Sequence, residues 1–390
     1  MNQEFIKGFS ELKFFENLPL IPPEKMFNQL HDLGYRGQEY ARKSLSLCAY
    51  RHVKRIKNIY LAGIPRSNLP PKSNYLLMGP TGCGKTYLVE LLFKKILKLP
   101  TVIVDVTGFS ETGYIGKDPI TILTQLLEAA RGSLIKASCG IVVLDEFDKL
   151  ASSSNQTRFD GQGSTKDVSG FGVQKELLRM MEESIIDIPT DFNNSLYSTR
   201  ETLMTDDIMF IACGAFSGFK GLAHLRQVSD NIGFTAKESK FKEQIAVTFK
   251  ESELMDIENF QMYGFLPELI GRFTRIIPLF PLDEKTLKEI LTENVINKYK
   301  KEFQSEGIEL IVEEKVLDRI VNLSFKRQTG ARGLNSILTQ YIEEVAYHCF
   351  GKNINCEVII DIDGDEIIHK IVKKGFSKKQ KKFFSKINKA

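Results

Sequence analysis

The stretch that most constrains this chain is GPTGCGKT, at residues 79–86. It matches GxxxxGK[ST] in full and lies between an apolar run, YLLMG, and a helix-like run, TYLVELLFKKILKL. Its glycines allow backbone N–H groups to curl around phosphate oxygens, and the next helix adds the positive end of its dipole. Lys85 is expected to reach the β- and γ-phosphates, and Thr86 to ligate Mg²⁺. The predicted phosphate-binding loop comprises Gly79, Pro80, Thr81, Gly82, Cys83, Gly84, Lys85 and Thr86.

A second stretch, IVVLDEFD at 141–148, supplies an acidic pair after a buried strand. Asp145 and Glu146 emerge where the strand ends, and ligands of open α/β sheets bind at that edge. Asp145 is expected to hold Mg²⁺ through water, and Glu146 to polarise the attacking water. Together with the loop, this pair predicts hydrolysis of ATP or GTP, with Mg²⁺ as a cofactor, but does not indicate the purpose of that hydrolysis.

The composition favours an ordinary globular protein of the cytoplasm. Hydrophobic residues make up 42% and charged residues 26% of the 390, and no apolar run is long enough for a membrane span. The charged N-terminus argues against a secretory signal, and six scattered cysteines without a CxxC pair suit a reducing compartment. Residues 373–390 hold eight lysines and no acid, so the net charge of +4 becomes −4 for the rest. An acidic body argues against nucleic acid as a partner.

Strand-like and helix-like runs alternate along the chain, which predicts a doubly wound α/β domain with a parallel sheet. Residues 1–21 are expected to be an irregular N-terminal extension, and residues 221–255 a long polar insertion. After residue 280 the pattern becomes mostly helical, and Asp-Gly between two apolar runs near the end predicts a β-hairpin. We therefore expect a large domain at 22–280, a small domain at 281–372 and a lysine-rich tail at 373–390.

Six motifs occur in the order and spacing of one known family. They are GPTGCGKT, ETGYIGKD, IVVLDEFDK, KDVSGFGVQ, GFLPELIGR and TGARGL. In these the chain resembles ClpX, an AAA+ protein unfoldase, from about Pro22 to about Ile371. The resemblance implies a P-loop AAA+ fold and a homohexameric ring that threads protein substrates.

The resemblance also implies roles for two arginines and one loop. Arg272, in LIGR, is similar to the arginine finger that reaches a neighbouring subunit's γ-phosphate, and a guanidinium suits a transferring phosphoryl group. Arg332, in TGAR, is similar to the sensor-2 residue that contacts nucleotide from the small domain. The GYRGQ stretch, in which Tyr35 is the second residue and Gln38 the last, lies where the family has its adenine-contacting segment.

The same resemblance implies roles for two short apolar motifs. Tyr114 and Ile115 lie between two glycines, as in the family's loop that lines the axial channel and contacts the translocating polypeptide. A bulky aromatic side chain provides contact area that tolerates any sequence. Ile232, Gly233 and Phe234 match the loop that docks on a ClpP-like peptidase, where several weak arms bind strongly through effective concentration.

The sequence departs from the family at several points. Residues 1–21 offer no counterpart of the N-terminal zinc-binding domain, and only Arg200 lies near the position of the basic RKH loop. Phe171 stands where an acid is usual, and Tyr35 and Arg36 replace an apolar pair. These differences leave the degradation tag and the adaptors open.

Two other functions remain open from the residues alone. The first is an ATP-dependent chaperone or remodelling factor that acts without a peptidase, which the Ile232–Phe234 motif would distinguish. The second is a DNA-acting motor, against which the acidic body and the aromatic channel loop argue.

Overall fold

The computed structural model describes residues 11–109, 117–151, 168–182, 184–189, 200–219, 256–327, 329–352, 356–364 and 366–373. Two compact units are present. The first comprises residues 1–33, 38–80 and 85–280, and the second comprises 34–37, 81–84 and 281–390. The short segments 34–37 and 81–84, the second of which is the glycine turn of the GPTGCGKT stretch, thus belong with the C-terminal part of the chain.

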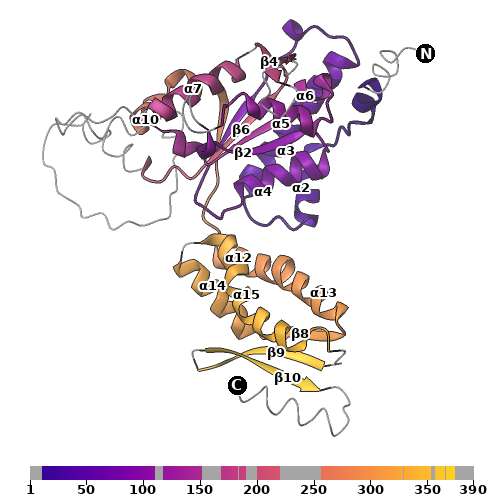
Figure 1. The fold of residues 1–390 in the computed structure, drawn as a ribbon, viewed down its shortest axis with the longest axis vertical. Helices are drawn as coiled ribbons and strands as arrows, with labels where there is room; N and C mark the ends of the chain where they lie inside the picture. The colour runs from indigo at the N-terminus through magenta and orange to yellow at the C-terminus, as the bar shows by residue number, and fades with distance from the viewer. Residues whose placement is uncertain are drawn as a thin grey trace, which may run out of the picture. The chain divides into compact units, whose positions relative to one another are not determined.

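The first unit is built on a five-stranded parallel sheet, seen in the upper part of Figure 1, with the order β2-β3-β6-β1-β7. Its strands are β1 (Asn74–Met78), β2 (Thr101–Asp105), β3 (Ile141–Asp145), β6 (Met209–Gly214) and β7 (Phe273–Pro278). β1 and β3 are apolar and fully or almost fully buried, because helices cover both faces of a parallel sheet. The predicted doubly wound α/β fold is confirmed.

The helices of the first unit follow the periodic runs of the sequence. They are α2 (Pro23–Asp32), α3 (Glu39–Tyr60), α4 (Lys85–Val89) with the π-helical η2 (Glu90–Ile96), α5 (Thr121–Ala129), α6 (Leu134–Ser138), α7 (Val168–Met181), α10 (Ile257–Tyr263) and α11 (Pro267–Ile270), with short 3₁₀ turns η1 (Arg66–Asn68), η3 (Val106–Gly108) and η4 (Phe147–Leu150). A small antiparallel hairpin of β4 (Ile185–Pro189) and β5 (Arg200–Met204) lies outside the main sheet. The sequence patterns did not predict this hairpin or β7.

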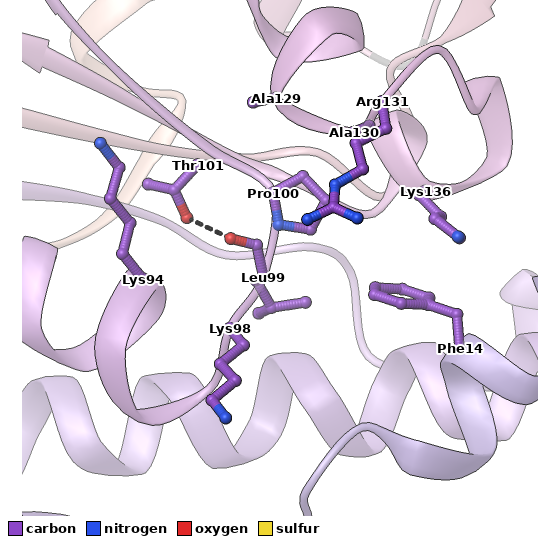
Figure 2. A pocket seen from close by; sticks show the side chains of 10 residues that line it. All are labelled: Phe14, Lys94, Lys98, Leu99, Pro100, Thr101, Ala129, Ala130, Arg131 and Lys136. Carbon is purple, nitrogen blue, oxygen red and sulfur yellow. Dashed lines mark hydrogen bonds between the residues drawn. The ribbon is translucent and has the colours of Figure 1, made fainter.

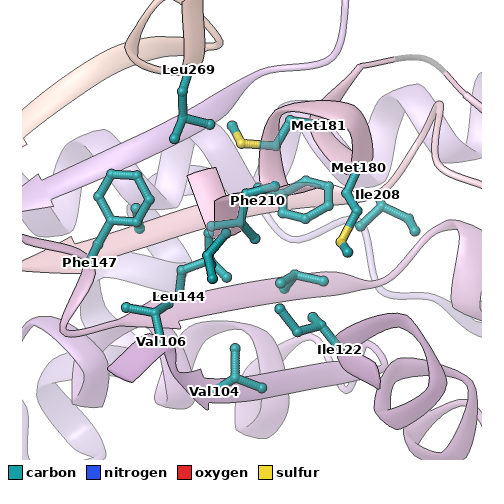
Figure 3. Close-up of a cluster of buried hydrophobic side chains, with 14 of the residues drawn as sticks. Val104, Val106, Ile122, Leu144, Phe147, Met180, Met181, Ile208, Phe210 and Leu269 are labelled. Carbon is teal, nitrogen blue, oxygen red and sulfur yellow. The ribbon is translucent and has the colours of Figure 1, made fainter. Parts of the chain in front are cut away.

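One continuous hydrophobic core lies between the sheet and the helices α5, α7 and α11 (Figure 3). Val104 and Leu144 from two strands meet Ile122 of α5 and Met180 of α7, all buried. Phe147, which follows β3 directly, stacks on Phe265 with ring centroids 5.0 Å apart. The core therefore extends to the point where the acidic pair leaves β3.

The N-terminal segment differs from the expectation of an irregular extension. Residues 11–17 are helical, and Phe15 is 2% exposed, stacked on Tyr60 at 4.6 Å. The Lys57 ammonium donates to the carbonyls of Phe15 and Glu16, at 2.9 and 3.1 Å. A cation at the end of a helix satisfies carbonyls that have no partner within it. The expectation was wrong because this helix is too short to show a period and is stabilised by packing on α3.

The second unit combines helices with a three-stranded sheet in the order β10-β9-β8. Its elements are α12 (Glu284–Ile290), the π-helical η6 (Leu291–Ile296), α13 (Asn297–Ser305), β8 (Ile308–Val312), α14 (Glu314–Lys326), α15 (Gly330–Cys349), β9 (Cys356–Asp363) and β10 (Glu366–Lys373). β9 and β10 form the expected hairpin, with Gly364 at a φ of +61° in the turn. The sequence patterns did not predict β8, which pairs with β9 in parallel.

In the described ranges, no helix is both long enough and apolar enough to cross a bilayer. The six cysteines are all free and buried.

Candidate nucleotide site

The predicted phosphate loop follows β1 and ends where α4 begins at Lys85. Gly82 and Gly84 have φ values of +78° and +94°, a region that side chains with a Cβ rarely enter. A Cβ on Gly79 would lie 2.5 Å from the carbonyl oxygen of Leu279, closer than atoms can approach. Three of the glycines in the motif are therefore required by backbone conformation or by space, as expected for a loop that curls around an anion.

Lys85 is buried, and its ammonium group is held by the loop itself. Nζ donates to the carbonyl oxygens of Gly79 and Pro80, at 2.7 and 3.0 Å. These contacts keep a positive charge at the loop, and no acid among the described residues forms an ion pair with it. The position suits a lysine that neutralises phosphate oxygens.

The hydroxyl of Thr86 and the carboxylate of Asp145 meet as the sequence predicts. Thr86 Oγ1 donates to Asp145 Oδ2 at 2.9 Å, and the backbone N–H of Glu146 donates to Asp145 Oδ1 at 3.0 Å. Both carboxylate oxygens are thus oriented, one by α4 and one by the turn after β3. A hydroxyl and a carboxylate at this separation are hard oxygen ligands of the kind Mg²⁺ takes, usually together with water and phosphate. The residues present therefore fit a magnesium–nucleotide complex.

Glu146 lies at the sharp turn that ends β3. Its φ is +56°, which is uncommon for a residue other than glycine, and its side chain is exposed. Backbone conformations of this kind persist only where the surroundings enforce them, and they cluster at functional sites. The buried Phe147 and Leu150 beyond the turn enforce it here, so Glu146 faces solvent directly after Asp145.

A further acid, Asp148, was not predicted as part of the site. It is 5% exposed, and its Oδ1 accepts a hydrogen bond from the backbone N–H of Ala215 at 3.0 Å. Asp148 therefore ties the turn after β3 to the end of the neighbouring strand β6. The signal in the sequence was the third acid of DEFD, which has a positioning role rather than a catalytic one.

Arg272 lies on the same unit as the acidic pair and is 46% exposed. Its guanidinium forms an ion pair with Glu182, just beyond the C-terminal end of α7, and its carbonyl oxygen accepts from the side chain of Asn74 at 3.1 Å. Within the described residues of its own chain, the recorded ion pair of this arginine is with Glu182, and none is recorded with the phosphate loop. This arrangement leaves the role of Arg272 toward a neighbouring subunit a prediction.

Within the second unit, the glycine turn of the phosphate loop contacts two segments far away in sequence. The backbone N–H of Ala331 donates to the carbonyl of Gly82 at 3.1 Å. The Tyr35 hydroxyl donates to the carbonyl of Gly84 at 3.3 Å, and Tyr35 is 3% exposed. Arg36 forms an ion pair with Glu293 on η6. Within this unit, the segment at Tyr35 and the start of α15 thus both contact the glycine turn at residues 81–84.

Arg332 occupies the first turn of α15 and is exposed. The buried face of α15, which includes Leu334, Ile337 and Leu338, fixes the helix in the core of the second unit. Tyr114, Ile115, Ile232, Gly233 and Phe234 lie outside the described residues. Their roles remain predictions.

Comparison with known proteins agrees with this arrangement. The family model described as the AAA domain (Cdc48 subfamily) matches residues 70–276, and that described as the C-terminal D2-small domain of ClpB protein matches 282–348. The ATP-dependent Clp protease ATP-binding subunit ClpX 3 of Methylococcus capsulatus is 37% identical over 342 residues, covering 84% of this chain and 76% of the relative. The ATP-dependent Clp protease ATP-binding subunit ClpX of Azotobacter vinelandii is 35% identical over 318 residues, covering 80% of this chain and 71% of the relative.

The chain belongs to the ClpX family of AAA+ proteins. The resemblance seen in the sequence motifs is therefore confirmed, and the protein is an ATPase. Membership of this family implies that the chain binds a nucleotide, and the roles of the individual residues of the phosphate loop and the acidic pair stay predictions.

Proposed function

We propose that this ATPase is a protein unfoldase that forms a homohexameric ring and translocates polypeptides through its axial channel into a ClpP-like peptidase. The observation that carries the proposal is the pair of oriented groups at the nucleotide site: Asp145 held by Thr86, with Glu146 exposed beside it. Two ClpX proteins that match most of the chain support the coupling of this site to protein unfolding.

Each residue of the site has one part in the proposed reaction. The backbone of residues 79–84 and Lys85 bind the phosphates, while Thr86 and Asp145 hold Mg²⁺, which neutralises charge on the phosphoryl group when bound. Glu146 accepts a proton from the attacking water. Arg272 of one subunit completes the nucleotide site of the next subunit. To do so, its guanidinium leaves Glu182 and binds the γ-phosphate.

Nucleotide would act on the second unit through the segments that contact the glycine turn. Gly82 and Gly84 bind the start of α15 and Tyr35, and Arg332 lies one residue beyond the contact at Ala331. Binding and loss of the γ-phosphate then change the conformation of this unit, and Tyr114 and Ile115 transmit the motion to the substrate. The proposed location of this machinery is the cytoplasm.

The decisive experiment is a degradation assay with a tagged, folded fluorescent reporter, ATP and a purified ClpP-like peptidase. We expect the full chain to abolish fluorescence and produce peptides, and Glu146→Gln to do neither. Phe234→Ala should still unfold the reporter but produce no peptides, with Phe376→Ala in the C-terminal tail as the matched control. Peptide release that is unchanged in Phe234→Ala would instead support the remodelling factor without a peptidase.

A further inference from the structure

A basic cavity of about 440 Å³ lies beside the start of β2 in the first unit. Its lining includes the side chains of Phe14, Lys94, Lys98, Arg131 and Lys136. All five strands of the sheet are parallel, and the phosphate loop follows the C-terminal end of β1. The start of β2 therefore belongs to the opposite edge of the sheet, so this cavity is separate from the nucleotide site.

The cavity carries four positive charges and no carboxylate among its lining residues. Within the described ranges, none of the four cations forms a recorded ion pair with an acid. The nearby Glu11 accepts a hydrogen bond from Ser133 at 3.1 Å rather than from a cation of the cavity. Four like charges around one cavity repel one another. An anion in the cavity would be attracted by all four and would reduce that repulsion.

The arrangement of the cations is uneven (Figure 2). The Arg131 guanidinium reaches over Pro100 toward Phe14, and Lys136 lies on the same side, with its ammonium 5.2 Å from the centre of the Phe14 ring. Lys94 and Lys98 extend from the other side of the chain at Leu99. Arg131 and Lys136 thus line the cavity on the side of Phe14, and Lys94 and Lys98 line it on the side of Leu99.

The backbone at two of these cations is unusual. Lys98 and Arg131 have φ values of +55° and +56°, and each follows the C-cap residue of a helix, a position where glycine is the common residue. Positively charged side chains interact favourably with a helix C-terminus, which accounts for part of this choice. The helix-end effect does not explain why Lys98 and Arg131 line the same cavity. A glycine at either position would bring no charge to it.

We propose that this cavity binds a small polyanion that carries phosphate groups. Its volume is in the range of pockets for small ligands, which suits a compact ligand better than an extended chain. The planar guanidinium of Arg131 can bind a phosphate through two parallel hydrogen bonds, and lysines act as point charges around it. Phe14 and Pro100 provide an apolar wall that excludes water from one side of the site.

Isothermal titration calorimetry with inorganic tripolyphosphate tests the proposal. The sample is the full chain with the substitution Lys85→Ala, so that the phosphate loop does not compete for tripolyphosphate. We expect saturable binding that weakens as salt is added, because the contacts are charge–charge contacts. Arg131→Gly combined with Lys136→Gln should lower the affinity at least about tenfold, since together they remove two of the four cations that line the cavity. Lys25→Gln combined with Lys54→Gln, at two exposed lysines outside the cavity, should leave it unchanged.

The single variant Arg131→Gly separates binding from folding. Glycine adopts a φ of +56° without strain, so the melting temperature of this variant should not fall below that of the parent. A loss of affinity together with unchanged thermal stability supports the site. Affinity that is unchanged in Arg131→Gly overturns it, and so does tighter binding of a poly-glutamate peptide than of tripolyphosphate, because that result would assign the surface to an acidic protein segment.

Discussion

Single residues decide the chemistry of the nucleotide site, and most of them belong to two short stretches of the sequence. Lys85, Thr86 and Asp145 lie where the motifs predict, because a phosphate loop and a strand end impose a fixed geometry on the residues beside them. Glu146 needs in addition a left-handed backbone that the sequence pattern does not announce. The roles of Asp145 and Glu146 therefore both depend on the turn that follows β3.

Glu146→Gln should abolish hydrolysis while nucleotide still binds. The amide keeps the size of the side chain but cannot accept the proton of the attacking water, and the loss of a general base typically costs a factor of about 10²–10⁴ in rate. Measurement of steady-state phosphate release and of binding of a fluorescent ATP analogue checks this. Glu128→Gln, an exposed acid on α5, is the matched control and should retain normal turnover. Normal turnover in Glu146→Gln would remove this residue from its assigned role.

At the scale of elements, the packing of α3 creates a buried hydrogen-bond network that no sequence motif indicates. Asp207 is 2% exposed and accepts hydrogen bonds from Arg55, Tyr60 and Arg66, at 3.3, 3.2 and 2.7 Å respectively. This network joins α3 and η1 to the residues just before β6. Burying a carboxylate is costly unless its charge is compensated, and three donors from two elements compensate it here.

The helix at residues 11–17 depends on one aromatic side chain. Phe15→Ala should lower the free energy of unfolding by about 3 kcal/mol, because a fully buried ring stacked on Tyr60 is removed. Leu12→Ala, on the same helix at 50% exposure, should change it by less than about 0.5 kcal/mol. Urea denaturation followed by far-ultraviolet circular dichroism measures both. Equal effects of the two substitutions would show that this helix does not pack as described.

The buried His52 on α3 should make stability depend on pH. Burial lowers its pKa from 6.5 to about 4, while the contact with the Cys139 carbonyl at 3.1 Å and the charge of Asp207 act against this and Arg55 acts with it. Between these pKa values the unfolded chain binds the proton and the folded chain does not, so stability rises with pH. Acidification from pH 6.5 to 4 should therefore cost about 3 kcal/mol.

The control for this effect is His52→Gln, which can still donate to the Cys139 carbonyl but does not titrate. Urea denaturation at a series of pH values should show a steeper loss of stability below pH 6.5 in the parent than in the variant. Parallel pH profiles would mean that His52 keeps an ordinary pKa in the folded protein.

At the scale of the whole molecule, the two compact units share the phosphate loop between them. Residues 79, 80, 85 and 86 belong to the first unit and 81–84 to the second. In the proposed function, the threading of a substrate is a property of the assembled ring.

Tyr114→Ala should keep ATP hydrolysis within about twofold of the parent and abolish unfolding of a folded reporter. The aromatic ring supplies sequence-independent contact area to the threaded chain and takes no part in phosphate chemistry. Tyr114→Phe, which keeps the ring, should retain unfolding. Unfolding at the normal rate in Tyr114→Ala would reject the channel role of this loop.

The sequence by itself determined the family, the α/β class and the positions of Lys85, Thr86 and Asp145 at a loop and a strand end, because these follow from residues adjacent in the chain. The left-handed backbone at Glu146 came only with the folded turn. Only the tertiary structure decided that Glu182 pairs with Arg272, that Asp148 binds the N–H of Ala215 and that Tyr35 reaches Gly84. It also decided which basic residues gather beside β2. These contacts join residues that are between 49 and 90 positions apart, and no local pattern records which distant partner a side chain will meet once the core has closed.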